Sequence, residues 1–248
     1  MAALLFEITH KSNKIYIMMK SISKLLMMVP VLMAAMLCSC NDGNDTPIPS
    51  GAFTVFATLE RLDNTGATFT TQELDDSELV TYVTTQELDS KNYTVGNRYV
   101  IVFSNQSGKR FQSGEITLYM AYSVFNGKAE SHSAADCEAA FKDPVNLSMI
   151  YRTGKWLNVE ATAPVGVQPK VFTVYVDQAT INNEVPEVYV AFKTDNINGP
   201  ERTFFGSFDL SPVWNLSTCH GLRVHYFTKG VETVEVINKT DLPIKPEL

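Results

Sequence analysis

Apolar and polar side chains alternate with a period of two from residue 53 onward, which is the pattern of β-strands that bury one face. Residues 53–59, FTVFATL, follow this alternation, and the turn-forming residues 63–66, DNTG, come soon after them. Residues 67–71 are again rich in residues that favour strands. The order of strand, turn and strand predicts a β-hairpin.

Three further segments continue the pattern, at residues 78–84, 98–104 and 116–124, and turns rich in Asp, Asn, Ser and Gly separate them. Five short strands within about 75 residues indicate a small barrel or a compact sheet. The alternation then stops between residues 126 and 144. Residues 133–141, SAADCEAAF, begin with a serine that can cap a helix and continue with several alanines. They predict a short helix that connects two domains.

From residue 145 the strand pattern returns, with about seven short strands separated by breaks that carry Pro and Gly. The predicted strands are residues 147–151, 156–162, 170–176, 187–193, 203–210, 222–227 and 231–236. This succession predicts an antiparallel β-sandwich. Its core face is expected to include Trp156, Val159, Val171, Val174, Tyr175, Val188, Val190, Phe192, Phe205 and Phe208.

The N-terminal region carries a different pattern. Lys20 and Lys24 precede an apolar run at residues 25–37, which ends in LCSC at residues 37–40. The run is about 13 residues long, whereas a membrane-spanning helix needs about 20, so it is expected to be an export signal. The LCSC end resembles a lipobox, in which cleavage leaves a cysteine that carries lipid, and Cys40 is the predicted lipidated residue.

The alternative is a plain signal peptide with two incidental cysteines, and a cleavage before Cys38 is disfavoured because Leu37 is large for such a site. We therefore expect residues 1–39 to be a signal peptide, whose true start could be Met18 or Met19. Residues 40–51, with the sequence CNDGNDTPIPSG, are polar and carry Pro and Gly, as is typical of a flexible tether. Residues 241–248 are expected to form a loose tail.

The charge balance excludes one class of partner. The chain has 20 basic and 27 acidic residues, and removal of residues 1–39 would take away four lysines and one glutamate, leaving 16 basic and 26 acidic residues. Proteins that bind nucleic acid neutralise phosphates with clustered Lys and Arg, and the chain has no such cluster. We therefore expect no nucleic-acid partner.

Two cysteines besides Cys40 would remain in the mature chain, Cys137 and Cys219. Outside the cytoplasm they could form a disulfide that closes a long loop. They could equally be two buried free thiols, which is a common state for cysteine. The sequence leaves both alternatives open.

Candidate catalytic motifs are incomplete. Gly206-Ser207-Phe208 holds only the first half of a nucleophile elbow, and Ser207 falls within a predicted strand. Cys219, His220 and His225 are the nearest approach to a metal site, but the two histidines would point to opposite faces of a strand unless His220 lies in a turn. We therefore predict no catalytic residues, no metal and no cofactor.

Acidic residues gather in predicted turns, as Glu73, Asp75, Asp76 and Glu78 and as Glu87 and Asp89. Solvated turn charges are the ordinary explanation, and they do not form the paired carboxylates of a glycosidase or an EF-hand loop. No phosphate-binding loop or dinucleotide motif is present either. The sequence therefore predicts a protein that is not an enzyme.

Taken together, several segments resemble the NigD-like family of secreted lipoproteins. These are the lipobox, the strand at residues 53–59 soon after the tether, DPV at 143–145, KWLNV at 155–159, EVYVAF at 187–192 and GSFDL at 206–210. The resemblance implies an all-β protein with a small OB-like barrel at residues 52–128 and a β-sandwich at residues 145–240. Residues 129–144 would be the connection with its short helix. The family offers no catalytic signature to carry over.

The expected function is that of a non-enzymatic, lipid-anchored cell-envelope protein that serves as a binding or assembly module. Its lipid at Cys40 would hold it in the outer membrane, on the periplasmic or the external side, where envelope proteins or glycans are candidate partners. One alternative is a fimbrillin-like pilus component. Another is a glycan-binding surface lipoprotein that uses tyrosines of the first domain, namely Tyr82, Tyr93, Tyr99, Tyr119 and Tyr122, although alternation predicts that most of them pack inside.

Overall fold

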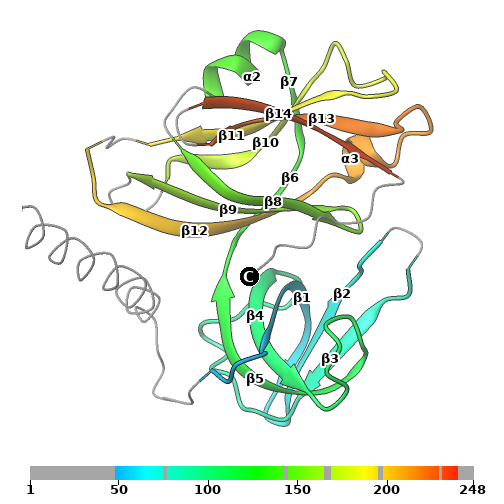
Figure 1. Ribbon diagram of the computed structural model, residues 1–248, viewed down its shortest axis with the longest axis vertical. Helices are drawn as coiled ribbons and strands as arrows, with labels where there is room; N and C mark the ends of the chain where they lie inside the picture. The colour runs from blue at the N-terminus through cyan, green and yellow to red at the C-terminus, as the bar shows by residue number, and fades with distance from the viewer. Residues whose placement is uncertain are drawn as a thin grey trace, which may run out of the picture. The chain divides into compact units, whose positions relative to one another are not determined.

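The computed structural model describes residues 48–74, 77–141, 145–164, 169–194, 198–228 and 231–239. Cys40, the signal peptide, most of the tether and the tail at 241–248 lie outside these residues, so the predictions about them stay predictions. The described residues belong to one compact unit. They fold as an OB-like barrel and a β-sandwich, which confirms the predicted all-β fold class (Figure 1).

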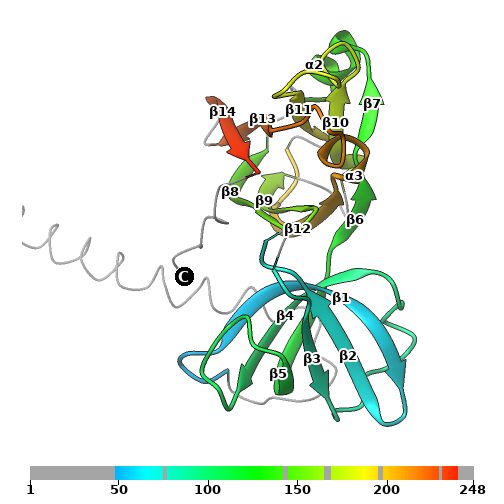
Figure 2. The same cartoon turned by 90° about the vertical axis from the view of Figure 1, so that its right-hand side faces the viewer.

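The barrel is a closed sheet with the strand order β1-β2-β3-β5-β4 (Figure 2). Its strands are β1 (Phe53–Asp63), β2 (Gly66–Thr71), β3 (Val80–Thr84), β4 (Arg98–Asn105) and β5 (Gly114–Ser123). Strand β1 pairs with both β2 and β4, and β3 and β5 pair in parallel to close the barrel. Alternate apolar side chains of all five strands fill its core, including Leu59, Phe69, Tyr82, Ile101 and Leu118.

The predicted hairpin is present as β1 and β2, and one glycine is essential to its turn. Gly66 has a backbone φ of +130°, a region that side chains with a Cβ rarely adopt. A Cβ at this position would lie 1.9 Å from the backbone oxygen of Thr84 in β3. The close approach of β2 and β3 therefore requires glycine here.

The sandwich consists of two sheets. The five-stranded sheet has the order β14-β13-β11-β10-β7, with β7 (Glu130–His132), β10 (Val171–Asp177), β11 (Glu187–Lys193), β13 (Gly221–Thr228) and β14 (Val231–Asn238). The four-stranded sheet has the order β6-β12-β9-β8, with β6 (Phe125–Lys128), β8 (Asn146–Thr153), β9 (Trp156–Pro164) and β12 (Glu201–Asp209). Most neighbours pair antiparallel, but β7 with β10, β11 with β13 and β6 with β12 pair in parallel.

Strands β6 and β7 differ from the prediction. The sequence predicts that residues 125–128 end the barrel and that residues 129–132 belong to the connection, whereas both strands are edge strands of the sandwich. The barrel thus ends with β5 at Ser123. The local pattern could not reveal this, because which sheet accepts a short edge strand depends on pairing with distant residues.

The predicted sandwich core is correct for six residues and wrong for four. Val159, Val174, Val188, Val190, Phe192 and Phe208 lie in the core. Trp156, Val171, Tyr175 and Phe205 do not. In a strand, neighbouring side chains point to opposite faces, so Tyr175 cannot share a face with the buried Val174. Phe205, next to the inward-facing Phe204, points instead toward the barrel.

Two short helices complete the domain. Helix α2 (Ala134–Phe141) is present where the sequence predicts a helix, but it lies within the sandwich, between β7 and β8, and does not connect the two domains. The hydroxyl of Ser133 accepts a hydrogen bond from the Asp136 amide (3.2 Å), as an N-cap does. Helix α2 packs on β10 and β11, on the side of the five-stranded sheet away from β8, β9 and β12 (Figure 1). Helix α3 (Ser211–Trp214) begins near Pro212, which suits a first helical turn.

The barrel and the four-stranded sheet meet at a junction built from apolar side chains of both domains. Phe56 and Val100 of the barrel pack with Tyr151 of the sandwich, and Tyr122, Val124, Met149 and Phe205 surround them. The ring of Phe56 makes edge-on contacts with Tyr151 and Phe205, at centroid distances of 5.9 and 6.1 Å. Such contacts stabilise beyond simple burial, so the two domains hold each other firmly.

A buried arginine lies at the same junction. The side chain of Arg98, from β4 of the barrel, is 1% exposed. Its guanidinium donates to Ser207 Oγ (2.6 Å) and Asn158 Oδ1 (3.3 Å) of the sandwich and to the Phe56 carbonyl (3.0 Å) of the barrel. It also lies 4.7 Å from the ring centre of Trp156. Burial lowers the pKa of Arg98 to about 9, because desolvation disfavours the charged form.

Candidate binding face on the five-stranded sheet

The outer face of the five-stranded sheet carries polar and aromatic side chains, whereas its inner face packs in the sandwich core. Strand alternation assigns Tyr175, Glu187, Tyr189, Arg223 and His225 to this outer face, because Val176, Val188 and Val224 between them are buried in the core. Helix α2 covers part of the face over β10 and β11. We refer to the outer side chains on β11, β13 and β14, together with the adjoining rings of β7 and β10, as the outer face.

Aromatic rings form a row across four neighbouring strands. Tyr175 of β10 pairs with Tyr189 of β11, which pairs with His225 of β13. The rings of Tyr189 and His225 are stacked, with centroids 4.3 Å apart and planes at 10°. At the other end, the rings of His132 and Tyr175 lie 3.9 Å apart. Cross-strand register therefore places Tyr175, Tyr189 and His225 on neighbouring strands, and the ring of His132, which pairs with Asp177, reaches Tyr175 diagonally. Together they form a row of half-buried rings.

The environment of this row raises the pKa of both tyrosines. For Tyr175, burial is the main cause and the charge of Glu130 adds to it. For Tyr189, burial again comes first and the charge of Glu187 follows. Both phenols therefore stay neutral hydrogen-bonding groups over the physiological pH range.

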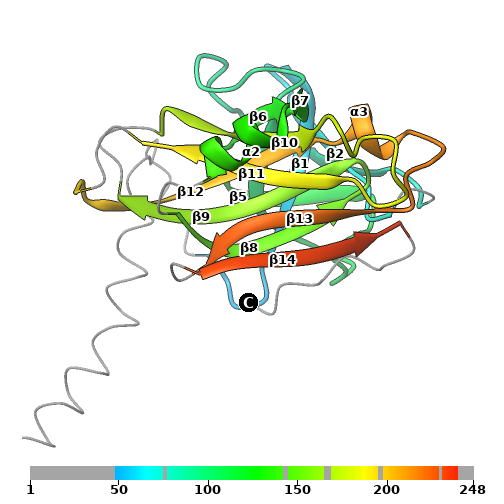
Figure 3. The same cartoon turned by 90° about the horizontal axis from the view of Figure 1, so that it is seen from above.

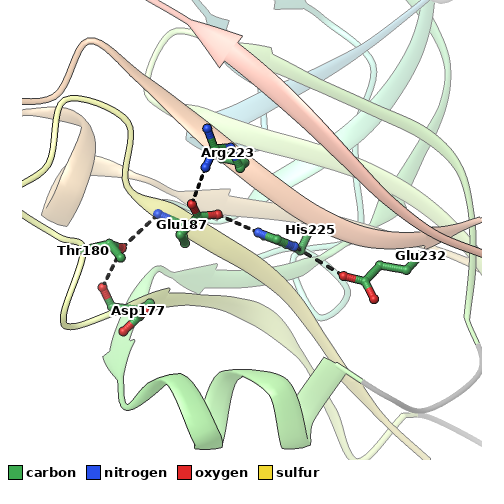
Figure 4. A network of polar contacts seen from close by, with 6 residues as sticks. All are labelled: Asp177, Thr180, Glu187, Arg223, His225 and Glu232. Atoms are coloured by element: carbon green, nitrogen blue, oxygen red, sulfur yellow. Dashed lines mark hydrogen bonds and ion pairs between the residues drawn. The ribbon is translucent and has the colours of Figure 1, made fainter.

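Glu187 is the centre of the polar network beside the rings (Figure 4). Its Oε1 accepts a hydrogen bond from Arg223 Nη1 (2.7 Å), and its Oε2 lies 2.6 Å from Nε2 of His225. The other ring nitrogen of His225 lies 3.6 Å from Glu232 Oε1 on β14. Register explains the first two contacts, because Glu187 pairs directly with Arg223 and Tyr189 with His225 in the parallel ladder.

The start of β11 is fixed from the loop that precedes it. The backbone N–H of Glu187 donates to the hydroxyl of Thr180 (2.9 Å), and this hydroxyl donates to the carbonyl of Asp177 at the end of β10 (3.0 Å). Glu187 is thus held through its backbone by the loop and through its carboxylate by β13. Such preorganisation lowers the entropic cost when a ligand binds.

This arrangement has the parts of a surface that binds a ligand. Both carboxylate oxygens of Glu187 are engaged by Arg223 and His225, so the carboxylate is poorly disposed to act as a general base. Within the described ranges, no group of three or more His, Cys, Asp or Glu side chains is arranged to hold a metal ion. Rings next to fixed donors and acceptors are the usual equipment of a surface that recognises a ligand.

The residues singled out from the sequence are dispersed. Ser207 is fully buried at the junction, where it donates to Asn158 (2.7 Å) and accepts from Arg98, so it has no role as a nucleophile. Cys219 is buried in the sandwich core and His220 is exposed, while His225 lies on the outer face. The structure therefore does not unite the three as a metal site.

Cys137 and Cys219 are both buried free thiols, which is one of the two alternatives that the sequence left open. Cys219 belongs to the sandwich core, whereas Cys137 lies on α2, on the other side of the five-stranded sheet. Burial raises the pKa of Cys137 to about 11 and also raises that of Cys219. Neither thiol is a reactive group.

The tyrosines of the barrel do not form a glycan platform. Tyr82 and Tyr99 lie in the barrel core, and Tyr93 packs against Tyr99 with ring centroids 5.2 Å apart. Tyr122 contributes to the junction, and Tyr119 shares a hydrogen bond with Ser104 (2.8 Å). Of the acidic turn residues, Glu78, Glu87 and Asp89 are exposed, as solvated charges are, and Asp75 and Asp76 lie outside the described residues.

Neither Arg98 nor the network around Glu187 was identified from the sequence. The outward positions of Glu187, Arg223 and His225 are visible in the alternation of their strands. Their meeting depends on the parallel pairing of β11 with β13, which no local pattern encodes. No helix among the described residues has the length and apolarity that a membrane crossing needs.

The fold has counterparts among solved structures. A protein of unknown function, DUF1344, from Bacteroides vulgatus matches with a TM-score of 0.59 at 14% identity, over 79% of this chain and 96% of the other. A predicted lipoprotein from Bacteroides fragilis matches with a TM-score of 0.54 at 9% identity, over 76% and 98%. A NigD-like immunity protein from Bacteroides caccae matches with a TM-score of 0.49 at 14% identity, over 82% and 100%.

At these identities the likeness is one of fold. No protein-family model matches the chain, and no curated protein matches its sequence. The barrel followed by a sandwich that the resemblance implied is present in the structure.

Proposed function

We propose that this chain is a non-enzymatic, lipid-anchored protein of the cell envelope, of the NigD-like type, and that it works by binding a partner on the outer face of its five-stranded sheet. The observation that carries the proposal is the state of Glu187. Its carboxylate is held by Arg223 and His225 beside a row of rings, which prepares the face for recognition.

The firm junction supports the same reading. Arg98 and Phe56 join the barrel to the sandwich through buried contacts, so the outer face is carried on a stiff two-domain body. A stiff body at the end of a short tether suits a protein that presents a surface near a membrane. Proteins of this fold include a predicted lipoprotein, which supports placing the chain in the envelope.

Anchoring through Cys40 is tested by metabolic labelling with a clickable fatty acid. The wild-type chain is expected to carry the label and to fractionate with membranes, and Cys40→Ala is expected to lose the label. Cys38→Ala is the matched control and should keep it. An unlabelled wild-type chain, or a label that persists in Cys40→Ala, would contradict the anchoring. Protease treatment of intact cells then distinguishes the external from the periplasmic side of the outer membrane.

Binding through the outer face is tested with the mature chain on arrays of envelope polysaccharides and on fractionated envelope proteins. Bound material should be lost when Tyr189→Ala removes the centre of the ring row. Tyr119→Phe is a suitable control, because it alters a tyrosine of the barrel and leaves the sandwich unchanged. If the wild type, Tyr189→Ala and Tyr119→Phe capture the same material equally well, the outer face is not the binding surface.

A second candidate is a pilus component, and one observation favours it. Strand β14 is an edge strand with three exposed valines, and pilus subunits assemble through incomplete or exchangeable edges. Membrane extracts examined without boiling would decide between the two. SDS-stable ladders would support the pilus assignment, and a single monomer band would support the anchored binding protein.

A further inference from the structure

Strand β14 forms one edge of the five-stranded sheet. It pairs along its whole length with β13, from Gly221 opposite Asn238 to Thr228 opposite Val231, without a register shift. In the described part of the chain, no other strand lies on its far side. Figure 3 shows β14 beside β13 at the margin of the sheet.

The register shows which backbone groups of β14 face away from the sheet. The Lys239 amide donates to the carbonyl of His220 (2.9 Å), so these two residues form a hydrogen-bonded pair. In an antiparallel ladder the hydrogen-bonded pairs alternate with non-bonded pairs. The amides and carbonyls of Glu232, Val234 and Val236 consequently point outward, toward the open edge.

The side chains of this edge are unusually apolar. Val231, Val234 and Val236 are 63, 47 and 43% exposed, and they make up half of the large exposed apolar side chains among the described residues. Natural edge strands are commonly protected by charged residues, proline or a β-bulge. Strand β14, whose sequence is VETVEVIN, has no proline, no lysine and no bulge, and its two charges are Glu232 and Glu235. The edge therefore has the features of a strand that accepts another strand.

Charge indicates what kind of strand would be accepted. Glu232 and Glu235 place one carboxylate on each face of β14, and Glu232 is exposed. A second copy of this chain is a poor fit, because the antiparallel pairing that sets Val234 against Val236 would also set Glu235 against its own copy. A partner strand with basic side chains would instead place opposite charges across the pair.

We propose that β14 binds an extended segment of another protein by strand addition, and that this segment carries apolar residues opposite Val234 and Val236 and a basic residue opposite Glu232. The outward amides and carbonyls of Val234 and Val236 supply the hydrogen bonds, their side chains supply apolar contact, and Glu232 selects a basic neighbour. This inference rests on the proposed binding function, because it names the partner class for the same sheet.

The test uses the full-length chain in detergent and a fluorescent peptide as long as β14 that places valines opposite Val234 and Val236 and lysines opposite Glu232 and Glu235. Anisotropy titration should show binding to the wild type. Val236→Pro removes one outward donor and leaves the ladder to β13 intact, so the dissociation constant should rise about fivefold or more, as expected for one lost hydrogen bond. Val236→Thr keeps the donor and should bind within about twofold of the wild type.

A peptide in which glutamate replaces each of these lysines tests the charge. It should bind at least tenfold more weakly than the lysine peptide, and Glu232→Lys should reduce that preference. Far-UV circular dichroism of Val236→Pro verifies that the fold persists, and Glu232→Lys provides an independent test should the proline variant unfold.

Three results would overturn the proposal. They are unchanged binding in Val236→Pro, equal affinity for the two peptides, and a stable dimer of the chain that Val236→Pro dissociates, since the dimer would identify a second copy as the occupant. Anchoring is read separately from the fatty-acid label at Cys40. If the chain carries the fatty-acid label but does not bind the lysine peptide, strand addition is refuted and the proposed anchoring is not.

Discussion

Replacing Arg98 with methionine is expected to destabilise the protein much less than replacing it with alanine. The guanidinium is buried at the junction, and its pKa falls from 12.5 to about 9. At about 1.4 kcal/mol for each pH unit, burying the charge costs on the order of 5 kcal/mol. Methionine retains most of the apolar stem and carries no charge, so this cost is removed together with the hydrogen bonds.

The hydrogen bonds of Arg98 offset that cost approximately. Those to Ser207 Oγ at 2.6 Å and to the Phe56 carbonyl at 3.0 Å are well formed and contribute about 2 kcal/mol each. Three longer contacts, to Thr58, Thr153 and Asn158 at 3.3 to 3.5 Å, add about 1 kcal/mol together. The cost of burying the charge and the contribution of the hydrogen bonds are therefore nearly equal. The packing of the aliphatic stem then decides how much stability a substitution loses.

Most acceptors keep a partner when the guanidinium is removed. The Phe56 carbonyl still accepts from the hydroxyl of Thr71 (2.9 Å), and Asn158 Oδ1 still accepts from Ser207 (2.7 Å). We expect Arg98→Met to lose about 1 kcal/mol of unfolding free energy. Arg98→Ala should lose about 3 kcal/mol or more, because it also leaves a cavity.

Urea unfolding of the mature chain, followed by circular dichroism and tryptophan fluorescence, measures both losses. Arg61→Met is the matched control, since Arg61 is an exposed barrel arginine that forms a surface ion pair with Asp63. It should change stability by less than about 0.5 kcal/mol. Equal losses for the alanine and methionine variants, or a loss above about 3 kcal/mol for methionine, would refute the reasoning.

Two further predictions concern the barrel turn and the thiol on α2. Gly66→Ala should destabilise the barrel by about 3 kcal/mol or more in urea unfolding, because its Cβ would collide with the Thr84 carbonyl. Gly96→Ala is the control and should lose about 1 kcal/mol, because φ is also positive there but the space is open. Similar losses for the two variants would contradict the steric argument. Because the pKa of Cys137 is raised in the folded protein, the thiol loses its proton at a lower pH in the unfolded chain than in the folded one. The contribution of the buried thiol to stability is therefore complete below pH about 9 and declines as the pH rises toward about 11. The wild type should lose more stability than Cys137→Ala across that window, and parallel curves would contradict the assignment.

The elements that depend on local pattern were predictable from the sequence. Period-two alternation identified most strands of both domains, and Ser133 with the alanines after it identified α2. The hairpin of β1 and β2 followed from a turn that needs glycine at residue 66. These features are set by the nearest neighbours in the chain.

The features that depend on pairing between distant strands were not predictable. Strands β6 and β7 belong to the sandwich because β12 and β10 accept them in parallel. The carboxylate of Glu187 meets His225 through the parallel pairing of β11 and β13. The same limit applied to Arg98, whose partners in β8, β9 and β12 come close only after both domains have formed.

The most direct test of the central claim, that this chain binds its partner on the outer face and edge of the five-stranded sheet, is site-specific photo-crosslinking in living cells. A photo-reactive residue is placed at Val236 on β14 or, as the control, at Val95 in the barrel, since both valines are well exposed. We expect a discrete adduct with another envelope protein from position 236, and none of that size from position 95. The same adduct from both positions, or no adduct from position 236, would contradict the account.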